Sequence, residues 1–375
     1  MYDTKPAPGV LGARERAEAL LARAAREGTP LIDGDRVTFV WLGEQAPRLL
    51  GDFGPALWVD CEQKLEAAAP GVWTVEVTLA ADAYVEYVYL LDGGQVTDPL
   101  NARTVSNGLG GAHHYFYMPG GGPTELARWH RGVARGMVTR VSVDGGHRIA
   151  SGKRDVYLYQ PAAPGPHPLL VVLDGQDYLK RARLTRIVDN LIAQDRIAPL
   201  AMALVAHGGH ARFLEYAGSE STLAFLTECV LPLARERLNV LEVGATPGVC
   251  GIMGASLGGL MAAYAGLRAP EIFGKVLCQS GSFDQMVTGR ESVVLDLVRA
   301  GRGKTTRFWL DVGRYERLIE SNRRLHVQLR MNGYDVALRE YNGGHNYPSW
   351  RDDVWRGLEA LFSRTERGQQ HAASD

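Results

Sequence analysis

From about residue 136 onward, short apolar segments of strand length alternate with segments of helical periodicity. Residues 169–173 are wholly apolar and lie between Pro168 and Asp174, a pattern typical of a central strand in a parallel sheet. Later strand-length segments occupy 201–206, 248–253, 275–278, 307–310 and 336–341, with helical segments between them. Repeated strand–helix units build a mostly parallel sheet with helices on both faces. The pattern therefore predicts one α/β domain over residues 123–375.

Residues 31–122 have a different pattern, with short alternating segments and no long helical periodicity. Trp73, Val75 and Val77 alternate with polar residues, which is the period of a half-buried strand. Glycine and proline separate these segments, and the glycines at 120–122 suit a linker. We expect a small antiparallel β-sandwich over 31–122, preceded over 1–30 by an N-terminal segment with an amphipathic helix at 13–28.

The composition argues against several kinds of partner. The chain has 41 Lys and Arg against 42 Asp and Glu, so it gives no electrostatic reason to expect nucleic acid or an acidic membrane. Its apolar runs are too short to span a bilayer, and the N-terminus lacks the apolar core of a signal peptide. The four cysteines are far apart and form no CxxC pair. We expect a cytoplasmic protein with no metal and no cofactor.

A G-x-S-x-G motif stands at 254–258, where a predicted strand ends and a predicted helix begins. Such an elbow is strained, so small residues must flank the serine. The hydroxyl of Ser256 then stands at the N-terminus of the helix, where the helix dipole favours developing negative charge. Ser256 is therefore the predicted nucleophile of a serine hydrolase. The alternative is a glycine-rich turn without catalysis.

A serine nucleophile in this context requires an acid and then a histidine later in the chain. His345 lies in a glycine-rich loop after the last predicted strand, where it can act as general base and then as general acid. Asp311 follows the apolar segment 308–310 and is the predicted orienting carboxylate. The alternatives are a surface histidine and a helix N-cap. Asp335 competes for the acid role, but it precedes its strand and belongs to the opposite edge of the sheet.

A tetrahedral oxyanion requires two preorganised hydrogen-bond donors. The backbone N–H of Leu257, directly after the nucleophile, is the first candidate. The second should come from the loop after the strand at 169–173, where Gly175 allows close backbone approach and the N–H of Gln176 is the predicted donor. An ordinary Asp-Gly turn is the alternative for this loop.

These residues lie in longer segments that resemble the enterochelin esterase family, within the esterase D-like group of α/β-hydrolases. The matching segments are 173–178 (LDGQDY), 212–216 (RFLEY), 254–260 (GASLGGL), 264–267 (YAGL), 273–276 (FGKV), 279–283 (QSGSF), 343–345 (GGH) and 350–351 (WR). The segment that ends in 98–101 (DPLN) resembles that family's N-terminal domain, an immunoglobulin-like early-set sandwich. The resemblance covers nearly the whole chain. It implies an α/β-hydrolase fold preceded by a small all-β domain.

Well-known members of that family are cytoplasmic and hydrolyse the trilactone of ferric catecholate siderophores, which releases iron after uptake. The resemblance implies a small-molecule ester as substrate and Ser256 with His345 as the catalytic pair, whereas Asp311 stands where the acid varies between members. It also implies that Arg212 and Glu215 contact the substrate. The further predicted substrate contacts are Asp174, Gly175, Tyr178, Tyr347 and Trp350.

A ferric tris-catecholate is an anion, so its binding site should offer cations or aromatic rings. Lys180, Arg181 and Arg183 follow the predicted oxyanion loop and supply cations, unless they form only the solvated start of a helix.

Two other functions remain open. One is a general carboxylesterase that acts on simple acyl or aryl esters, such as acetyl or feruloyl esters, with the same triad. The other is a carbohydrate-binding protein whose sandwich stacks Trp41, Trp58 and Trp73 on sugar rings. Aromatic residues at strand spacing are more often core residues, which counts against the second.

Overall fold

The computed structural model describes residues 12–364 apart from 109, 151, 285–291 and 302–304. The first eleven residues of the predicted N-terminal segment therefore lie outside the described part. The chain divides into two compact units. The first unit extends to Gly122 and also includes Asn342–Gly344, and the second comprises Pro123–Tyr341 and the chain from His345 onward.

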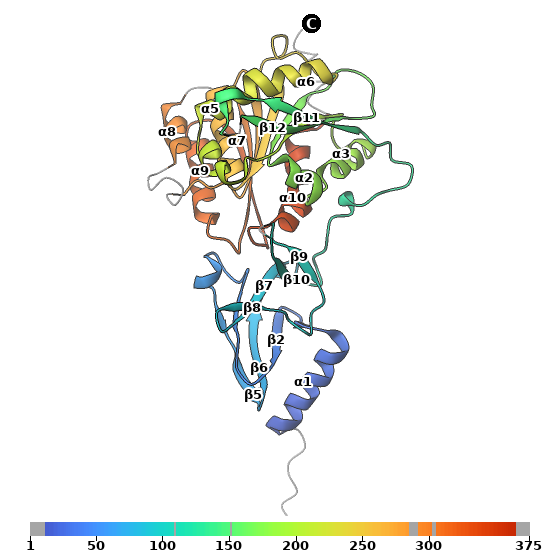
Figure 1. Ribbon diagram of the computed structural model, residues 1–375, viewed down its shortest axis with the longest axis vertical. Helices are drawn as coiled ribbons and strands as arrows, with labels where there is room; N and C mark the ends of the chain where they lie inside the picture. The colour runs from blue at the N-terminus through green and yellow to red at the C-terminus, as the bar shows by residue number, and fades with distance from the viewer. Residues whose placement is uncertain (1–11, 109, 151, 285–291, 302–304, 365–375) are drawn as a thin grey trace, which may run out of the picture. The chain divides into compact units, whose positions relative to one another are not determined.

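The first unit contains two antiparallel sheets. One has the order β1 (Leu31–Asp33), β2 (Arg36–Leu42), β6 (Val72–Thr78), β5 (Glu66–Ala69). The other has the order β4 (Gln63–Lys64), β3 (Arg48–Gly51), β7 (Tyr84–Leu91), β10 (Ala112–Tyr117), β9 (Thr104–Ser106), with β8 (Gly94–Val96) beside β7. Phe39 of the first sheet meets Tyr87 and Phe116 of the second edge to face, and all three rings are fully buried. Helix α1 (Ala13–Glu27) lies beside this sandwich (Figure 1).

The second unit is built on one eight-stranded sheet. Its strands, in spatial order, are β11 (Met137–Asp144), β12 (Lys153–Gln160), β14 (Ala201–Val205), β13 (Leu169–Leu173), β15 (Cys250–Ala255), β16 (Phe273–Gln279), β17 (Arg307–Gly313) and β18 (Asp335–Tyr341). The pairs β11–β12 and β12–β14 are antiparallel, and the remaining pairs are parallel. The central strands β13 and β14 are buried along their whole length, as the apolar run at 169–173 predicts.

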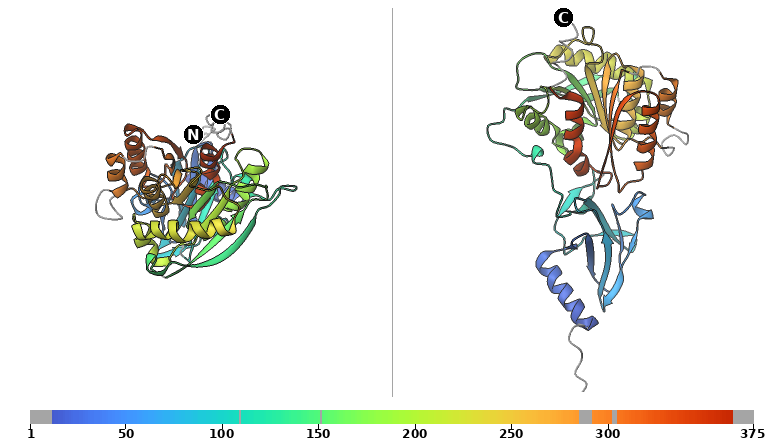
Figure 2. Two further views of the ribbon diagram at one scale, coloured as in Figure 1. Left: turned by 90° about the horizontal axis from the view of Figure 1, so that it is seen from above. Right: turned by 180° about the vertical axis from the view of Figure 1, so that it is seen from behind.

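Helices cover both faces of this sheet (Figures 1 and 2). One face carries α4 (Arg212–Tyr216), α5 (Glu220–Phe225), α6 (Leu231–Arg237), α7 (Leu257–Arg268), α8 (Val293–Ala300) and α9 (Ile319–Met331). The other carries α2 (Gly175–Lys180), α3 (Leu184–Ala193) and α10 (Tyr347–Phe362). Short 3₁₀ turns lie at Trp58–Asp60, Glu125–Ala127, Gly146–Arg148 and Gly209–Ala211. No helix in the described ranges combines the length and apolarity needed to cross a bilayer.

The helical segment that precedes β15 is interrupted. A π-helical segment, Leu226–Val230, joins α5 to α6, and α6 has a proline in its first turn. Pro232 has no N–H to donate to a carbonyl in the preceding turn, so the hydrogen-bond ladder is locally wider there.

The parallel strands place their following loops at one edge of the sheet. Asp174 follows β13, Ser256 follows β15, Ser280 follows β16 and His345 lies in the loop after β18. Because the carboxyl ends of parallel strands meet at the same edge, chain segments far apart in sequence converge there.

Candidate active site

Ser256 occupies a tight turn between β15 and α7. Its backbone has φ 59° and ψ −121°, a conformation that non-glycine residues rarely adopt. The turn requires glycine at position 254, since a Cβ there would lie 2.5 Å from the backbone of Gly258. The backbone N–H of Ser256 donates to Gln279 O at 2.9 Å, which ties the turn to the neighbouring strand β16. This is the geometry of a nucleophile elbow.

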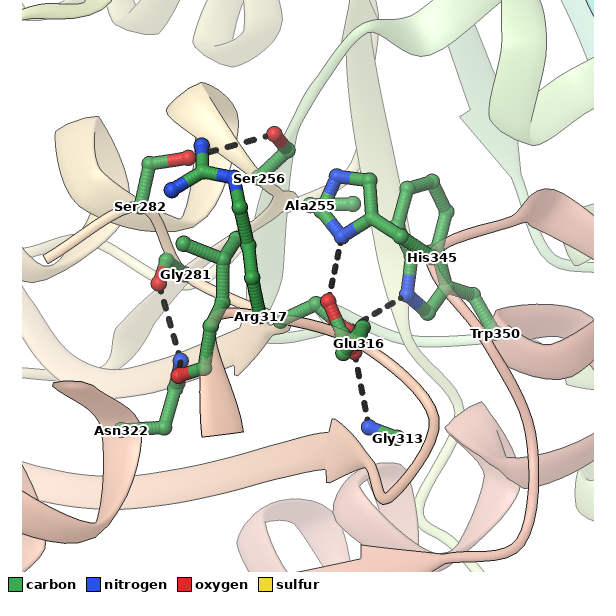
Figure 3. A network of polar contacts seen from close by, with 12 residues as sticks. Ala255, Ser256, Gly281, Ser282, Gly313, Glu316, Arg317, Asn322, His345 and Trp350 are labelled. Carbon is green, nitrogen blue, oxygen red and sulfur yellow. Dashed lines mark hydrogen bonds and ion pairs between the residues drawn. The ribbon is translucent and has the colours of Figure 1, made fainter. Parts of the chain in front are cut away.

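The hydroxyl of Ser256 has a second serine as its neighbour. Ser256 Oγ and Ser282 Oγ are 3.3 Å apart, and the Ser282 N–H donates to Ser256 O at 3.0 Å. Within the described residues, Ser256 makes no hydrogen bond to His345, although Figure 3 shows one ring nitrogen of His345 facing Ser256. Catalytic hydrogen bonds are often long before substrate binds, so this arrangement is compatible with a nucleophile and its base.

The other ring nitrogen of His345 contacts a buried carboxylate. His345 Nδ1 lies 2.5 Å from Glu316 Oε2, and the Glu316 side chain is only 3% exposed (Figure 3). Glu316 Oε1 accepts hydrogen bonds from Gly313 N at 2.8 Å and from Ser280 Oγ at 2.5 Å. A carboxylate bound in this way fixes the histidine tautomer and leaves Nε2 available for the serine.

The predicted pairing of Asp311 with His345 is therefore wrong. Strand β17 continues through Asp311 to Gly313, so this carboxyl points into the interior, where it accepts from Gln279 Nε2 and Trp309 Nε1 at 3.2–3.3 Å. Burial, together with the charge of Asp353, raises the pKa of Asp311 well above its usual value. The sequence reasoning missed Glu316, although it is the first acidic residue after the glycine that ends β17.

The two predicted oxyanion donors both lie in the first turn of a helix. Leu257 opens α7 and Gln176 is the second residue of α2, so their N–H groups have no acceptor within the helix. A Cβ at Gly175 would lie 2.3 Å from the backbone of Leu204, which is why only glycine allows this loop to pack on β14. The Gln176 side chain accepts the N–H of His207 at 3.0 Å and fixes the loop further.

Arg212 connects this loop to the nucleophile elbow. Its guanidinium donates to both oxygens of Asp174 at 2.7 and 2.6 Å and to Ala255 O, next to Ser256, at 3.2 Å. Burial alone would lower the pKa of Arg212, but the hydrogen bonds of Asp174 hold it above its usual value. Asp174 is only 2% exposed, so it acts as a partner of Arg212, which corrects its prediction as a substrate contact.

Two other predicted substrate contacts are buried as well. Glu215 accepts two hydrogen bonds from Arg154 of β12, at 2.7 and 3.0 Å, and its side chain is 6% exposed. Tyr178 is fully buried, and its hydroxyl donates to Gln279 Oε1 at 2.9 Å. Both predictions are wrong because these side chains lie in the interior and bond to other residues of the chain.

Aromatic residues at the start of α10 support His345. The Trp350 ring meets the His345 ring edge to face, with centroids 5.0 Å apart. Tyr347 packs against Trp350 at 4.9 Å and lies under the guanidinium of Arg181 at 4.3 Å. Trp350 is buried behind the histidine, so in this structure it holds His345. Direct substrate contact by Tyr347 stays a prediction.

No metal site is visible in the part of the chain that the structure describes, since no three His, Cys, Asp or Glu residues cluster as ligands there. All four cysteines are free thiols.

An elbow serine at the carboxyl edge of a mostly parallel sheet, with a histidine and a carboxylate from later loops, is the arrangement of an α/β-hydrolase. Comparison with known proteins is consistent with this class. The chain belongs to the Esterase family, whose sequence profile matches residues 148–361.

The chain is similar to several enterobactin and salmochelin esterases. The iron(III) enterobactin esterase of Escherichia coli K12 is 27% identical over 278 residues, which cover 71% of this chain and 67% of that protein. The same-named enzyme of Dickeya dadantii is 30% identical over 230 residues, covering 56% and 52%. The iron(III) salmochelin esterase of E. coli CFT073 is 27% identical over 338 residues, covering 80% of each chain.

Solved structures agree on the fold. Ferric enterobactin esterase from Salmonella typhimurium superposes with a TM-score of 0.72 at 22% identity, covering 89% of this chain and 95% of that one. Shigella flexneri enterobactin esterase, solved in the presence of enterobactin, gives 0.69 at 23% identity, covering 87% and 92%. The predicted α/β-hydrolase fold and the resemblance to enterochelin esterases are confirmed.

Proposed function

We propose that this chain is a serine esterase that hydrolyses the trilactone of ferric catecholate siderophores through an acyl-enzyme on Ser256. The contact between His345 Nδ1 and the buried Glu316 carboxylate at 2.5 Å carries the mechanistic part of the proposal. The substrate is supported by the names of the relatives, which are iron(III) enterobactin and salmochelin esterases.

The proposed reaction follows from the roles of these groups. His345 Nε2 takes the Ser256 proton as the oxygen attacks the ester carbonyl, and Glu316 stabilises the imidazolium that forms. The N–H groups of Leu257 and Gln176 receive the oxyanion, and His345 then returns the proton to the leaving alkoxide. Water repeats the sequence on the acyl-enzyme and releases the acid, so one hydroxy acid is produced for each ester cleaved.

Arg212 has a positioning role in this proposal. Through Asp174 it binds the loop that carries the predicted oxyanion donor Gln176. Through Ala255 O it binds the elbow that carries the other predicted donor, Leu257. A bidentate arginine–carboxylate pair is geometrically specific, so it keeps the two N–H groups in register.

Three cations next to the predicted oxyanion loop suit an anionic substrate. Lys180 and Arg183 are exposed, and Arg181 lies over the Tyr347 ring. Their charges suit the anionic iron complex of a catecholate.

We also place the enzyme in the cytoplasm, an assignment supported by the free thiols, since disulfides persist mainly in oxidising compartments.

Product analysis tests the proposal. Purified full-length protein is incubated with an iron-loaded catecholate trilactone and, separately, with a p-nitrophenyl ester, and products are identified by mass spectrometry. Linear trimer, dimer and monomer should appear with the wild type and be absent with Ser256→Ala. Ser282→Ala is the matched control, since it removes the neighbouring hydroxyl and should keep most of the activity.

Two results would count against the proposal. An intact trilactone beside rapid cleavage of the p-nitrophenyl ester would make the chain a general carboxylesterase. Full activity of Ser256→Ala on either ester would exclude Ser256 as the nucleophile.

A further inference from the structure

The carboxylate of Glu316 is held from two sides. One oxygen contacts His345, while the other accepts hydrogen bonds from Gly313 N at 2.8 Å and Ser280 Oγ at 2.5 Å. The side chain is almost completely buried. Hydrogen bonds that donate to a buried carboxylate favour its ionised form, so these two donors influence how readily Glu316 and His345 together take up a proton.

The direction of the Ser280 hydroxyl proton follows from its neighbours. Ser280 is fully buried, and its Oγ lies 2.9 Å from Trp350 Nε1 and 3.2 Å from the Tyr341 hydroxyl. An indole N–H can only donate, so Ser280 must accept from Trp350. Burial raises the pKa of Tyr341 well above its usual value, so Tyr341 keeps its proton and can donate to the second lone pair of Ser280. The one proton of Ser280 is then left for Glu316.

Trp350 joins this donor to the histidine. Its indole N–H binds Ser280, and its ring packs edge to face on His345. Its backbone oxygen accepts from Gln279 Nε2 at 3.2 Å, which fixes the start of α10 to the end of β16. Trp350 therefore positions both the His345 imidazole and the Ser280 hydroxyl that donates to Glu316.

We propose that Ser280 is a positioning residue of this active site, anchored by Trp350, and that its hydroxyl keeps the Glu316 carboxylate ionised and directed at His345. This inference rests on the proposed serine-esterase function. A donor to Glu316 lowers the affinity of the Glu316–His345 pair for a proton.

Several other charged or titratable groups face this pair. Tyr341 on β18 and Asp311 on β17 interact with Glu316 directly. The elements around the pair also carry Asp353 with its partners Arg339 and Arg356, and the ion pairs Arg317–Asp284 and Arg314–Glu340. Substitution of Ser280 leaves all of them in place, so a shift in pH dependence would report the loss of one hydroxyl.

The test uses two substitutions that remove the same hydroxyl group but differ in how well they tolerate the positive φ at position 280. Ser280 has φ 48°, which glycine adopts without strain and alanine does not. Ser280→Ala and Ser280→Gly both remove the hydroxyl. In both, the acid limb of kcat/KM against pH should move up by about 0.5–1 pH unit. The value of kcat should fall about tenfold with KM nearly unchanged, because only the transition state requires the ordered pair.

Two further variants sharpen the comparison. Trp350→Phe keeps an aromatic ring beside His345 but removes the N–H that polarises Ser280, so it should move the acid limb upward by a smaller amount. Thr306→Val is the matched control. Thr306 is fully buried and its hydroxyl donates to Gly266 O at 3.0 Å, away from the His345 pair, so the acid limb should not move.

The readout separates this inference from the proposed function. Rates are measured on an ester that the wild type cleaves and Ser256→Ala does not. In a separate measurement, the His345 ring is titrated by NMR, with its signals assigned by comparison with His345→Gln. Absence of Ser256-dependent cleavage would sink the proposed function, while the ring titration would still report on Ser280. An acid limb and a ring titration that both stay in place in Ser280→Gly would overturn the inference, and so would a shift confined to Ser280→Ala.

Discussion

Two carboxyl groups near the edge of the sheet have opposite surroundings. Glu316 meets His345 and accepts donors on its other oxygen, whereas Asp311 is enclosed by Gln279 and Trp309. Burial and a neighbouring carboxylate favour the neutral form of Asp311. A neutral carboxyl offers little charge to an imidazolium, so these environments favour Glu316 over Asp311 as the acid of the proposed mechanism.

Substitution should separate these roles. Glu316→Gln keeps the shape but removes the charge and the correct tautomer, so kcat should fall by about 10²–10⁴-fold with little change in KM. Asp311→Asn resembles the protonated side chain that burial already favours, so kcat should fall less than about tenfold. Steady-state rates of both variants on one ester provide the comparison. A more severe loss in Asp311→Asn than in Glu316→Gln would reverse the assignment.

The sequence predicted Ser256 and His345 as the catalytic pair because local pattern defines their positions. An elbow requires glycines at fixed spacing, and a glycine-rich loop after the last strand leaves a histidine free to reach across. The partner of His345 depends on where β17 ends, and an apolar run sets a strand boundary only to within a few residues. The prediction of Asp311 is wrong because this residue lies inside the strand, whereas Glu316 lies just beyond its end.

Burial explains the other corrections at this scale. Tyr178 and Glu215 stand in segments that match the family and were expected to contact substrate. Both belong to short helices that pack against the sheet, and residue type alone does not show which face of so short a helix turns inward.

At the scale of elements, the buried pair Arg154–Glu215 joins β12 to α4. Arg154 donates to both carboxylate oxygens, and both side chains are at most 6% exposed. Removing one partner of a buried pair leaves an uncompensated charge, which costs far more than removing both.

Glu215→Gln should therefore lower the free energy of unfolding by about 3 kcal/mol, and the double variant Arg154→Met/Glu215→Gln should recover most of that loss. Urea unfolding of the wild type and both variants measures the difference. KM should stay within about twofold of the wild type under conditions where the variants are folded. A large rise in KM without a loss of stability would restore Glu215 as a substrate contact.

Strand β16 carries a charge that is costly in the folded state. Burial lowers the pKa of Lys275 to about 8, and its ammonium donates to Leu361 O at 2.7 Å. In the unfolded chain the group titrates near its ordinary value of 10.5, so between these pH values the unfolded state binds more protons. The buried charge of Lys275 therefore destabilises the folded state fully below about pH 8, and this effect decreases as the pH rises toward 10.5.

Comparison with Lys275→Met isolates this effect. The stability of the wild type relative to the variant should increase by about 2 kcal/mol between pH 7.5 and pH 10. Unfolding by urea at several pH values gives both curves, and other titrating groups cancel in the difference. A relative stability that stays constant or falls over this range would refute the assignment of the lowered pKa to Lys275.

The strands were more predictable than the helices. The wholly apolar run at 169–173 coincides with β13, since a strand buried on both faces requires apolar residues throughout. Helices α2, α4 and α8 were not predicted, because segments of five to eight residues contain too few turns for a clear period. Their stability comes from tertiary packing, since α2 packs on β14 whereas α4 and α8 pack on α7.

At the scale of the whole molecule, the chain contains two architectures. A two-sheet antiparallel unit and an eight-stranded, mostly parallel sheet covered by helices each have a core of their own. The switch from a period of two to strand–helix alternation indicated both architectures. Neither pattern indicates that Asn342–Gly344, directly before His345, belongs with the first unit. Such long-range grouping depends on tertiary contacts that local periodicity does not encode.

The reaction proposed for this molecule passes through an ester between substrate and Ser256. In a rapid-quench experiment, full-length protein is mixed with an excess of iron-loaded catecholate trilactone, stopped in acid and digested. We predict that the peptide containing Ser256 gains the mass of the intact, iron-free trilactone in the wild type, because ring opening onto the serine expels no group, and shows no gain in Ser256→Ala. Turnover with no adduct on that peptide, or an adduct that persists in Ser256→Ala, would contradict nucleophilic catalysis by Ser256.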